Sequence, residues 1–252
     1  MGSAAYSNTL APMRTVALIQ ARTGSTRLPG KVLAELGGQP LLSLVIERTL
    51  AAPGLDAVAV ATSDLRRDDA VAALAERSGV GVVRGSEQDV LDRFRAGARQ
   101  LGAELVVRVT ADCPLVDPEL IGRLLAFRER EGLDYAAIPT GGIPGVRCFP
   151  DGLDTEVFTA DALDIAWREA TSAPDREHVS LLIKRDARFR RAFLESDVDL
   201  ARERWTVDHP EDLEFVRAVV ARLGRDCGYR DVLALLEREP TLREINVQPS
   251  RT

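Results

Sequence analysis

The chain has 252 residues, 45% of them hydrophobic and 29% charged. This is enough apolar sequence for the core of one large α/β domain, and it excludes a disordered protein. The net charge of −6 argues against general binding to nucleic acid or to a membrane surface, and no apolar run approaches the length of a membrane span. Three scattered cysteines, Cys113, Cys148 and Cys227, favour a reducing cytoplasm over a disulfide framework.

The N-terminal end of the chain leads into a strand and a charged loop. Residues 1–14 are small and polar, so we expect a flexible tail there without the apolar segment of a signal peptide. The apolar run over 16–19 is typical of a buried parallel strand, and Pro40 opens a helix over 40–48.

Residues 20–31, the cradle loop, directly follow the first strand. They contain three cations, two glycines and three hydroxyl side chains. Glycine lets backbone amides approach an anion, and Arg offers planar donor pairs for phosphate oxygens, so this composition indicates a polyphosphate site. The alternative is an ordinary basic surface loop. The glycine spacing matches neither a Walker loop nor the dinucleotide-binding fingerprint.

Strand and helix patterns then alternate along the chain. Strands are predicted over 57–62, 80–83 and 104–110, and helices over 68–77 and 89–101. The alternation predicts a single Rossmann-like α/β domain over 15–240, with a mostly parallel twisted sheet and helices on both faces. Residues 241–252 are expected to be a C-terminal tail. Open sheets of this class bind ligands beyond the carboxyl ends of their strands, where the cradle loop lies.

Two acidic residues, Asp112 and Asp208, each follow a segment that resembles a strand. A carboxylate at that edge of the sheet can bind Mg²⁺ together with phosphate oxygens. The alternatives are a turn for Asp112 and a helix N-cap for Asp208, whereas Asp117 is better explained as a cap. If Asp112 and Asp208 share a metal, they repel each other without it, so changing either to Asn should leave stability unchanged or raise it.

The middle of the chain is less regular. Residues 134–150 are rich in Gly and Pro and are expected to belong to a small dimerisation lobe. Asp154 and Glu156 lie two apart, so on a strand they face the same side. Buried there, they would need a hydroxylated ligand or a partner Arg; a solvated edge strand is the alternative. His178, in a helix predicted over 174–185, is more often a structural than a catalytic residue.

Taken together, these segments resemble the cytidylyltransferases that make CMP-activated sugars. The resemblance is carried by residues 20–31 (QARTGSTRLPGK), 61–63, 84–93, 108–115, 149–157, 176–179 and 206–213. It is closest to the 3-deoxy-manno-octulosonate and spore-coat polysaccharide branches and more distant from the acylneuraminate enzymes. Residues 152–156 (GLDTE) and 176–178 (REH) resemble the spore-coat branch. His209 stands where the family usually has Thr.

The resemblance implies a Mg²⁺-dependent transfer of CMP from CTP to a sugar acid or a related small acceptor, with release of pyrophosphate and without a covalent nucleophile. It implies that Arg22, Arg27 and Lys31 grip the triphosphate as catalytic cations. It implies that Asp112 and Asp208 hold the metal. The nucleotide site would comprise Leu18, Gln20, Ala21, Arg22, Gly24, Ser25, Arg27, Lys31, Arg84, Ser86 and Asp112, and the acceptor site Asp154, Glu156, Arg176 and His178.

Two other functions stay open at this point. A nucleotide-sugar-dependent glycosyltransferase would share the fold, but such enzymes usually carry Asp-x-Asp after a strand, and residues 110–113 contain one acid. A non-catalytic regulator should have lost a phosphate-binding cation or a metal-binding Asp, and this chain keeps them all. The resemblance also implies a homodimer with a twofold interface, and binding partners that are small molecules rather than nucleic acid or membrane.

Overall fold

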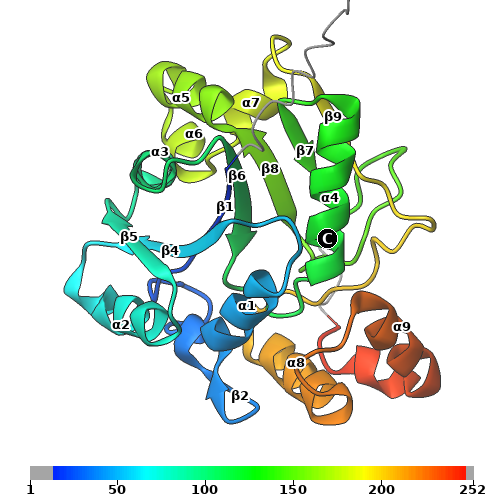
Figure 1. The fold of residues 1–252 in the computed structure, drawn as a ribbon. Coiled ribbons are helices and arrows are strands. Elements are labelled where there is room, and N and C mark those ends of the chain that lie inside the picture. The colour runs from blue at the N-terminus through cyan, green and yellow to red at the C-terminus, as the bar shows by residue number, and fades with distance from the viewer. Residues whose placement is uncertain (1–13, 248–252) are drawn as a thin grey trace, which may run out of the picture.

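The computed structural model describes residues 14–247 of the chain (Figure 1). Within that range seven strands form one sheet, in the order β5-β4-β1-β6-β8-β7-β9. Its strands are Thr15–Gln20 (β1), Ala57–Ser63 (β4), Gly81–Gly85 (β5), Leu105–Thr110 (β6), Tyr135–Ala137 (β7), Thr155–Thr159 (β8) and Arg191–Phe193 (β9). Because β8 alone of these strands runs antiparallel to its neighbours, the predicted mostly parallel sheet is confirmed.

Helices cover both faces of this sheet, as the alternating pattern predicts (Figure 1). Alternate residues of β1 divide between two cores: Ala17 and Ile19 pack on one face, and Val16 and Leu18 on the other. The helices are Leu41–Leu50 (α1), Asp69–Arg77 (α2), Val90–Gln100 (α3), Pro118–Glu131 (α4), Ala160–Glu169 (α5), Ala173–Glu177 (α6), Leu181–Arg185 (α7), Pro210–Leu223 (α8) and Tyr229–Arg238 (α9). Three short 3-10 helices are Lys31–Leu33 (η1), Arg66–Asp68 (η2) and Pro240–Glu244 (η3), and a small hairpin pairs Glu35–Leu36 (β2) with Gln39–Pro40 (β3).

The predicted cap at Asp117 is confirmed. Its Oδ1 accepts hydrogen bonds from the Glu119 and Leu120 amides at 2.8 and 3.2 Å, at the start of α4. Its Oδ2 accepts the Tyr229 amide at 2.7 Å, which joins the start of α9 to the same corner. The carboxylate therefore satisfies free amides of two helices and holds the turn that follows β6.

The strands after residue 134, β7, β8 and β9, extend the main sheet. Two predicted elements differ in the structure. The helix predicted over 174–185 is divided into α6 and α7, because Val179 between them adopts a φ of +54°. The segment before Asp208 is not a strand of the sheet: it makes one isolated bridge, between Arg204 and Asp151.

The segment over 203–207 is nevertheless held firmly in place. The Trp205 amide donates to the Asp151 carbonyl at 2.6 Å, and the Val207 amide donates to the Asp112 carbonyl at 2.8 Å. Trp205 itself is fully buried. These contacts hold the chain alongside the end of β6, so Asp208 lies beside Asp112.

Packed chain continues past residue 240, where the sequence predicts the domain to end. Leu242 in η3 is buried, and the Asn246 side chain donates to the Arg204 carbonyl at 2.9 Å. Most of the predicted N-terminal tail, residues 1–13, lies outside the described residues, as do residues 248–252. Within residues 14–247, no helix has the length and apolarity that a membrane crossing requires.

Gly152 occupies a position where a side chain does not fit. Its φ is +106°, and a Cβ atom there would lie 2.5 Å from the Thr206 nitrogen. Gly152→Ala is expected to lower the free energy of unfolding by about 2–4 kcal/mol, because it adds a clash with backbone to the strain of a positive φ.

Gly141→Ala is the matched control for that measurement. Gly141 has a φ of +72°, but apart from the glycine and its two chain neighbours no heavy atom of the described chain lies within 4 Å of its Cβ position. Gly141→Ala should therefore lower the free energy of unfolding through backbone strain alone, by about 1–2 kcal/mol. Urea unfolding of both variants measures the difference, and equal losses would contradict the close approach at Gly152.

Candidate active site

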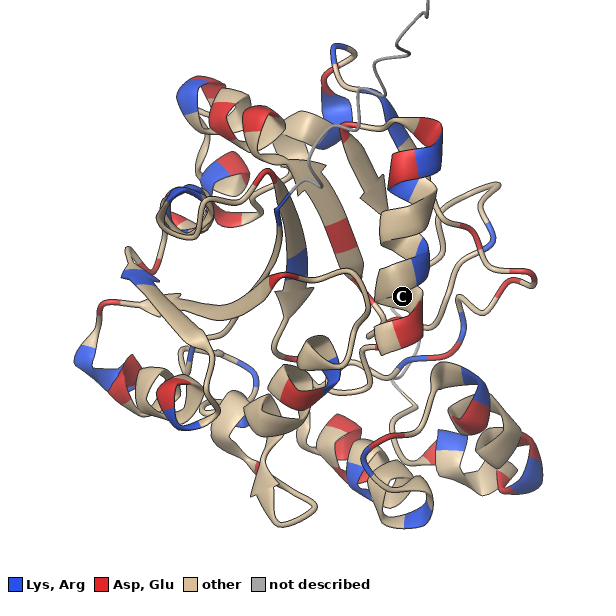
Figure 2. Ribbon diagram, in the orientation of Figure 1, with Lys and Arg blue, Asp and Glu red and all other residues tan. Residues whose placement is uncertain are grey.

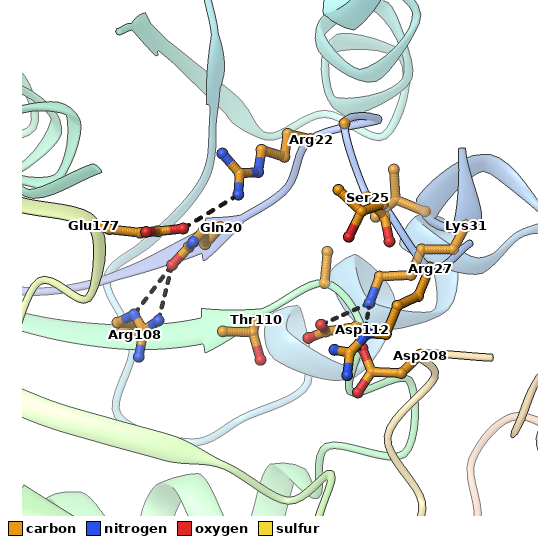
Figure 3. A pocket seen from close by; sticks show the side chains of 14 residues that line it. Gln20, Arg22, Ser25, Arg27, Lys31, Arg108, Thr110, Asp112, Glu177 and Asp208 are labelled. Atoms are coloured by element: carbon orange, nitrogen blue, oxygen red, sulfur yellow. Dashed lines mark hydrogen bonds and ion pairs between the residues drawn. The ribbon is translucent and has the colours of Figure 1, made fainter. Parts of the chain in front are cut away.

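Two neighbouring strands end in the loops that enclose the cavity beside the cradle loop, termed the main cavity. Gln20 at the end of β1 is aligned with Thr110 at the end of β6, so the cradle loop and Asp112 leave the sheet side by side. Figure 3 shows the resulting pocket, whose volume is about 420 Å³. It is lined by Gln20, Arg22, Gly24, Ser25, Thr26, Arg27, Lys31, Val32, Arg108, Thr110, Ala111, Asp112, Glu177 and Asp208.

Lys31 lies at the centre of the polar wall of this cavity. Its Nζ donates to Asp112 Oδ2 at 2.9 Å, to Asp208 Oδ1 at 3.0 Å and to the Val207 carbonyl at 2.7 Å. Burial alone would lower the pKa of the Lys31 ammonium, but the two carboxylates outweigh it and hold that pKa above its ordinary value. One charged nitrogen thus bridges two carboxylates that lie almost a hundred residues apart in the chain.

Asp208 has two further cationic partners. Arg27 Nη2 contacts its Oδ1 at 2.8 Å, and Arg204 Nη2 contacts its Oδ2 at 3.2 Å. Burial raises the pKa of the Asp208 carboxyl, but Lys31, Arg27 and Arg204 reverse that effect and leave the pKa below its ordinary value. The N-cap of α8 is His209, so the Asp208 side chain serves the cavity and not the helix end.

The cradle loop is anchored from behind by a buried acid. Asp68, at the end of η2, accepts the Thr23 amide and the Thr23 hydroxyl on Oδ1, both at 2.7 Å, and Ser63 donates to its Oδ2. Burial raises the pKa of the Asp68 carboxyl, but these hydrogen bonds outweigh it and lower the pKa. Residues 61–63, at the end of β4, therefore support the loop and do not line the cavity.

Arg22 points across the mouth of the cavity between two acids. Its Nη1 donates to the Glu87 carbonyl at 3.2 Å, and its Nη2 lies 3.6 Å from Glu177 Oε1 (Figure 3). Gly24 lies close to this cluster: a Cβ there would lie 2.6 Å from Glu87 Oε1, so that side chain would have to move. Arg22 is held by contacts at the surface, while Lys31 is buried.

A second cavity, of about 280 Å³, adjoins the first and shares Arg108 and Thr110 with it. Asp154 and Glu156 both line it, so they do share one side. The only charged residue of β6 is the basic Arg108, and the only charged residue of β8 is the acidic Glu156. Figure 2 shows one blue segment on β6 and one red segment on β8. The two are aligned across the antiparallel pair, and Arg108 Nη1 donates to Glu156 Oε2 at 3.0 Å.

Glu156 is fully occupied by protein partners. Tyr135 Oη donates to it at 2.9 Å, Ser180 Oγ lies 2.9 Å from Oε2, and Lys184 forms an ion pair with Oε1. Burial raises the pKa of the Glu156 carboxyl, but Arg108 and Lys184 outweigh it and lower that pKa to about 2. Of the alternatives left open by the sequence, pairing with Arg is therefore correct, and a solvated edge is wrong.

The lowered pKa of Glu156 makes stability depend on pH. In the unfolded chain this carboxyl titrates near 4.5, so its stabilising contribution is present above about pH 4.5 and is lost as the pH falls through about 2. Glu156→Gln is expected to lower the free energy of unfolding at neutral pH, and the difference from wild type should shrink between about pH 5 and pH 2. Denaturant unfolding across this range measures it. Glu195→Gln, an exposed carboxylate paired with Arg147, is the control; a constant gap for Glu156→Gln would contradict the linkage.

Several predicted site residues lie away from the main cavity. Leu18 is buried within β1, and the Ala21 amide is already bonded to the Ala61 carbonyl. Arg84 donates to the Ser63 and Leu65 carbonyls, and Ser86 accepts the Gln88 and Asp89 amides. Arg176 donates to the Ala170 carbonyl, and His178 is exposed at the end of α6. The binding roles of these residues stay predictions.

Six residues that line the main cavity are not among the predicted site residues: Thr26, Val32, Arg108, Thr110, Ala111 and Glu177. A signal was available for Arg108, since a charged residue inside an apolar run of a buried strand needs a partner. Its Nε and Nη2 both donate to Gln20 Oε1, at 3.2 and 2.9 Å, which fixes the guanidinium between the two cavities. Glu177 belongs to the 176–178 (REH) motif and is the last residue of α6, and the motif alone does not show that it lines this cavity.

The donor set suits a hard divalent cation. Asp112 and Asp208 offer carboxylate oxygens, which Mg²⁺ prefers, and one Nζ atom already contacts both, so one cation can reach both. Among residues 14–247, no group of three or more His, Cys, Asp or Glu side chains is arranged to hold a metal ion. A metal bound here would therefore take its remaining oxygens from phosphate or water.

Comparison with known proteins places this geometry in context. Residues 16–230 match the model of a family described as cytidylyltransferase. The chain is 36% identical to the spore coat polysaccharide biosynthesis protein SpsF of Bacillus subtilis, over 88% of this chain and 94% of that protein. It is 44% identical to a 3-deoxy-manno-octulosonate cytidylyltransferase of Anaeromyxobacter sp., over 50% of this chain and 51% of that one. A solved cytidylyltransferase structure from Leptospira borgpetersenii superimposes with a TM-score of 0.86 at 26% identity, covering 95% of this chain and all of that one.

Proposed function

The chain belongs to the cytidylyltransferase family, and on that premise we propose that it transfers CMP from CTP to a small hydroxylated acid with release of pyrophosphate. The acceptor class is drawn from the 3-deoxy-manno-octulosonate enzyme it resembles. The proposal includes a divalent metal, taken to be Mg²⁺, and a homodimer in a cytoplasmic setting.

The observation that supports this function best is the meeting of three cations and two carboxylates in one cavity. Arg22, Arg27 and Lys31 line it together with Asp112 and Asp208. A triphosphate carries several negative charges and needs cations that reach its oxygens, while its metal needs carboxylates close by. A general anion site would need the cations but not the acids.

In this proposal the residues of the chain bind the two substrates, orient them and neutralise the charge of the triphosphate. Arg22, Arg27 and Lys31 would hold the triphosphate so that its α-phosphorus faces the acceptor hydroxyl, and an in-line attack would expel pyrophosphate. Mg²⁺, held by Asp112 and Asp208, would neutralise phosphate charge. Because Lys31 Nζ now lies between those carboxylates, we expect it to turn toward the phosphates when metal and nucleotide bind.

The second cavity would hold the acceptor. Asp154 presents its carboxylate there, braced by the Gly152 amide at 2.9 Å. Arg108 faces both cavities, and its charge suits an acid that lies next to the nucleotide. The acceptor roles of Arg176 and His178 rest on the family resemblance.

A pyrophosphate-release screen tests the function. The four nucleoside triphosphates are each combined with a panel of sugar acids that includes 3-deoxy-manno-octulosonate, in the presence of Mg²⁺. We expect release with CTP, dependent on the acceptor, and a CMP-linked product by mass spectrometry. Release with no acceptor of the panel, together with sugar transfer from a nucleotide sugar, would instead support a glycosyltransferase.

A further inference from the structure

We propose that Arg204 is a positioning residue that orients the Asp208 carboxylate toward the cavity and joins it to the turn that leads into the acceptor pocket. One guanidinium contacts three acids: Nη1 lies 3.3 Å from Asp151 Oδ2, and Nη2 lies 3.2 Å from Asp208 Oδ2 and 3.0 Å from Asp212 Oδ2. Arg204 does not line either cavity, so it acts through these partners.

The two oxygens of Asp208 have different neighbours. Lys31 and Arg27, both from the cradle loop, contact Oδ1. Arg204, from outside the cavity, contacts Oδ2. The carboxylate therefore presents Oδ1 to the cavity because Arg204 holds Oδ2 behind it through Nη2, and the planar guanidinium leaves Nη1 to reach Asp151.

Asp212 makes the arrangement rigid. It is 1% exposed, and its Oδ2 accepts the Asp208 and His209 amides, both at 2.9 Å, in addition to the Arg204 contact. The backbone and the side chain of Asp208 are thus fixed by one Arg204–Asp212 pair at the start of α8. A carboxylate that is held in this way loses little conformational freedom when a metal ion binds to it.

The third contact of Arg204 reaches the acceptor side. Asp151 begins the turn in which the Gly152 amide donates to Asp154, and Asp154 lines the second cavity. Gly152 packs directly on the backbone of 205–206, next to Arg204. A displacement of Asp151 is therefore passed to Asp208 through one side chain.

The test measures metal binding and not turnover, and it rests on the proposed role of Asp208. Free Mn²⁺ is followed by electron paramagnetic resonance as it binds to the protein with a non-hydrolysable CTP analogue. Arg204→Met is expected to weaken Mn²⁺ binding by about ten- to a hundredfold, the usual effect of removing a group that orients a metal ligand. If Arg204 were merely a competing cation, its removal would tighten binding, so an unchanged or higher affinity overturns the inference.

Two further variants separate geometry from charge and from folding. Arg204→Lys keeps the charge but cannot span three acids, so it should also bind Mn²⁺ more weakly; wild-type affinity there would overturn positioning. Arg222→Met is the control and should match wild type, because this exposed residue of α8 contacts Glu239 and the Ala218 carbonyl, away from the site. Unfolding midpoints show which variants are folded.

A double-mutant cycle tests the link to the acceptor side without a large loss of stability. Asp151→Asn alters one partly exposed partner of Arg204. Its effect on Mn²⁺ affinity should differ between the wild-type and the Arg204→Met background; additive effects would overturn the link. If the wild-type protein binds no Mn²⁺ with the analogue, the metal role of Asp208 fails and this inference with it. Binding by wild type that Arg204→Met leaves intact removes only the role of Arg204.

Discussion

Asp208→Asn and Asp112→Asn are each expected to lower kcat by about a hundredfold or more, because each removes a fixed charge that the transfer of a nucleotidyl group needs. Initial rates of pyrophosphate release at saturating CTP, titrated with Mg²⁺, measure the loss. If the two residues only formed a turn or a cap, Asn would replace Asp at little cost, and near-normal rates would contradict the metal role.

The structure changes the expected effect of these substitutions on stability. From the sequence, removal of one of two repelling acids should be neutral or stabilising. In the fold, however, Lys31, Arg27 and Arg204 surround Asp208, so attraction outweighs repulsion. Asp208→Asn should lower the free energy of unfolding by about 1–3 kcal/mol, and Asp112→Asn, which is more exposed, by about 1 kcal/mol or less. Asp197→Asn, a highly exposed acid, is the control for both rate and stability.

Arg22→Ala and Arg27→Ala are expected to weaken CTP binding by about ten- to a hundredfold, since one charge-assisted contact to phosphate contributes about 1.5–3 kcal/mol. Both side chains are partly exposed, at 31% and 51%, so the fold should persist. Lys31→Ala should weaken CTP binding and lower the steady-state rate at least as much as either Arg substitution. Isothermal titration with a CTP analogue and steady-state rates measure these effects.

Lys31 needs a separate control because it is buried. Its removal leaves Asp112 and Asp208 facing each other without their shared partner, so Lys31→Ala should also lose stability, contrary to what an exposed loop would predict. Arg130→Ala removes an exposed cation outside the cavity and should bind CTP like wild type. Wild-type activity in all three cradle variants would contradict the phosphate role.

Local sequence alone determined the parallel strands β1, β4 and β6 and the edge of the sheet where the cradle loop and Asp112 lie. The runs that became β1, β4 and β6 are almost wholly apolar because both of their faces are buried. Strands of this kind, separated by amphipathic helices, allow few arrangements other than a parallel sheet. The cradle loop and Asp112 follow two such strands, so their common edge was predictable.

Contacts between distant segments decided the rest, and local patterns do not record them. The segment before Asp208 looks like a strand, yet its neighbours are Asp151 and the Asp112 carbonyl, and the bond to that carbonyl delivers Asp208 to the cavity. Glu156 could have faced solvent or ligand until β8 was aligned with Arg108. Arg204 reads as one more surface cation until folding brings three acids around it. The sequence by itself determined which residue types the site contains and the edge of the sheet where it forms. Only the tertiary structure decided which charges pair, because ion pairs depend on distances that the folded chain alone sets.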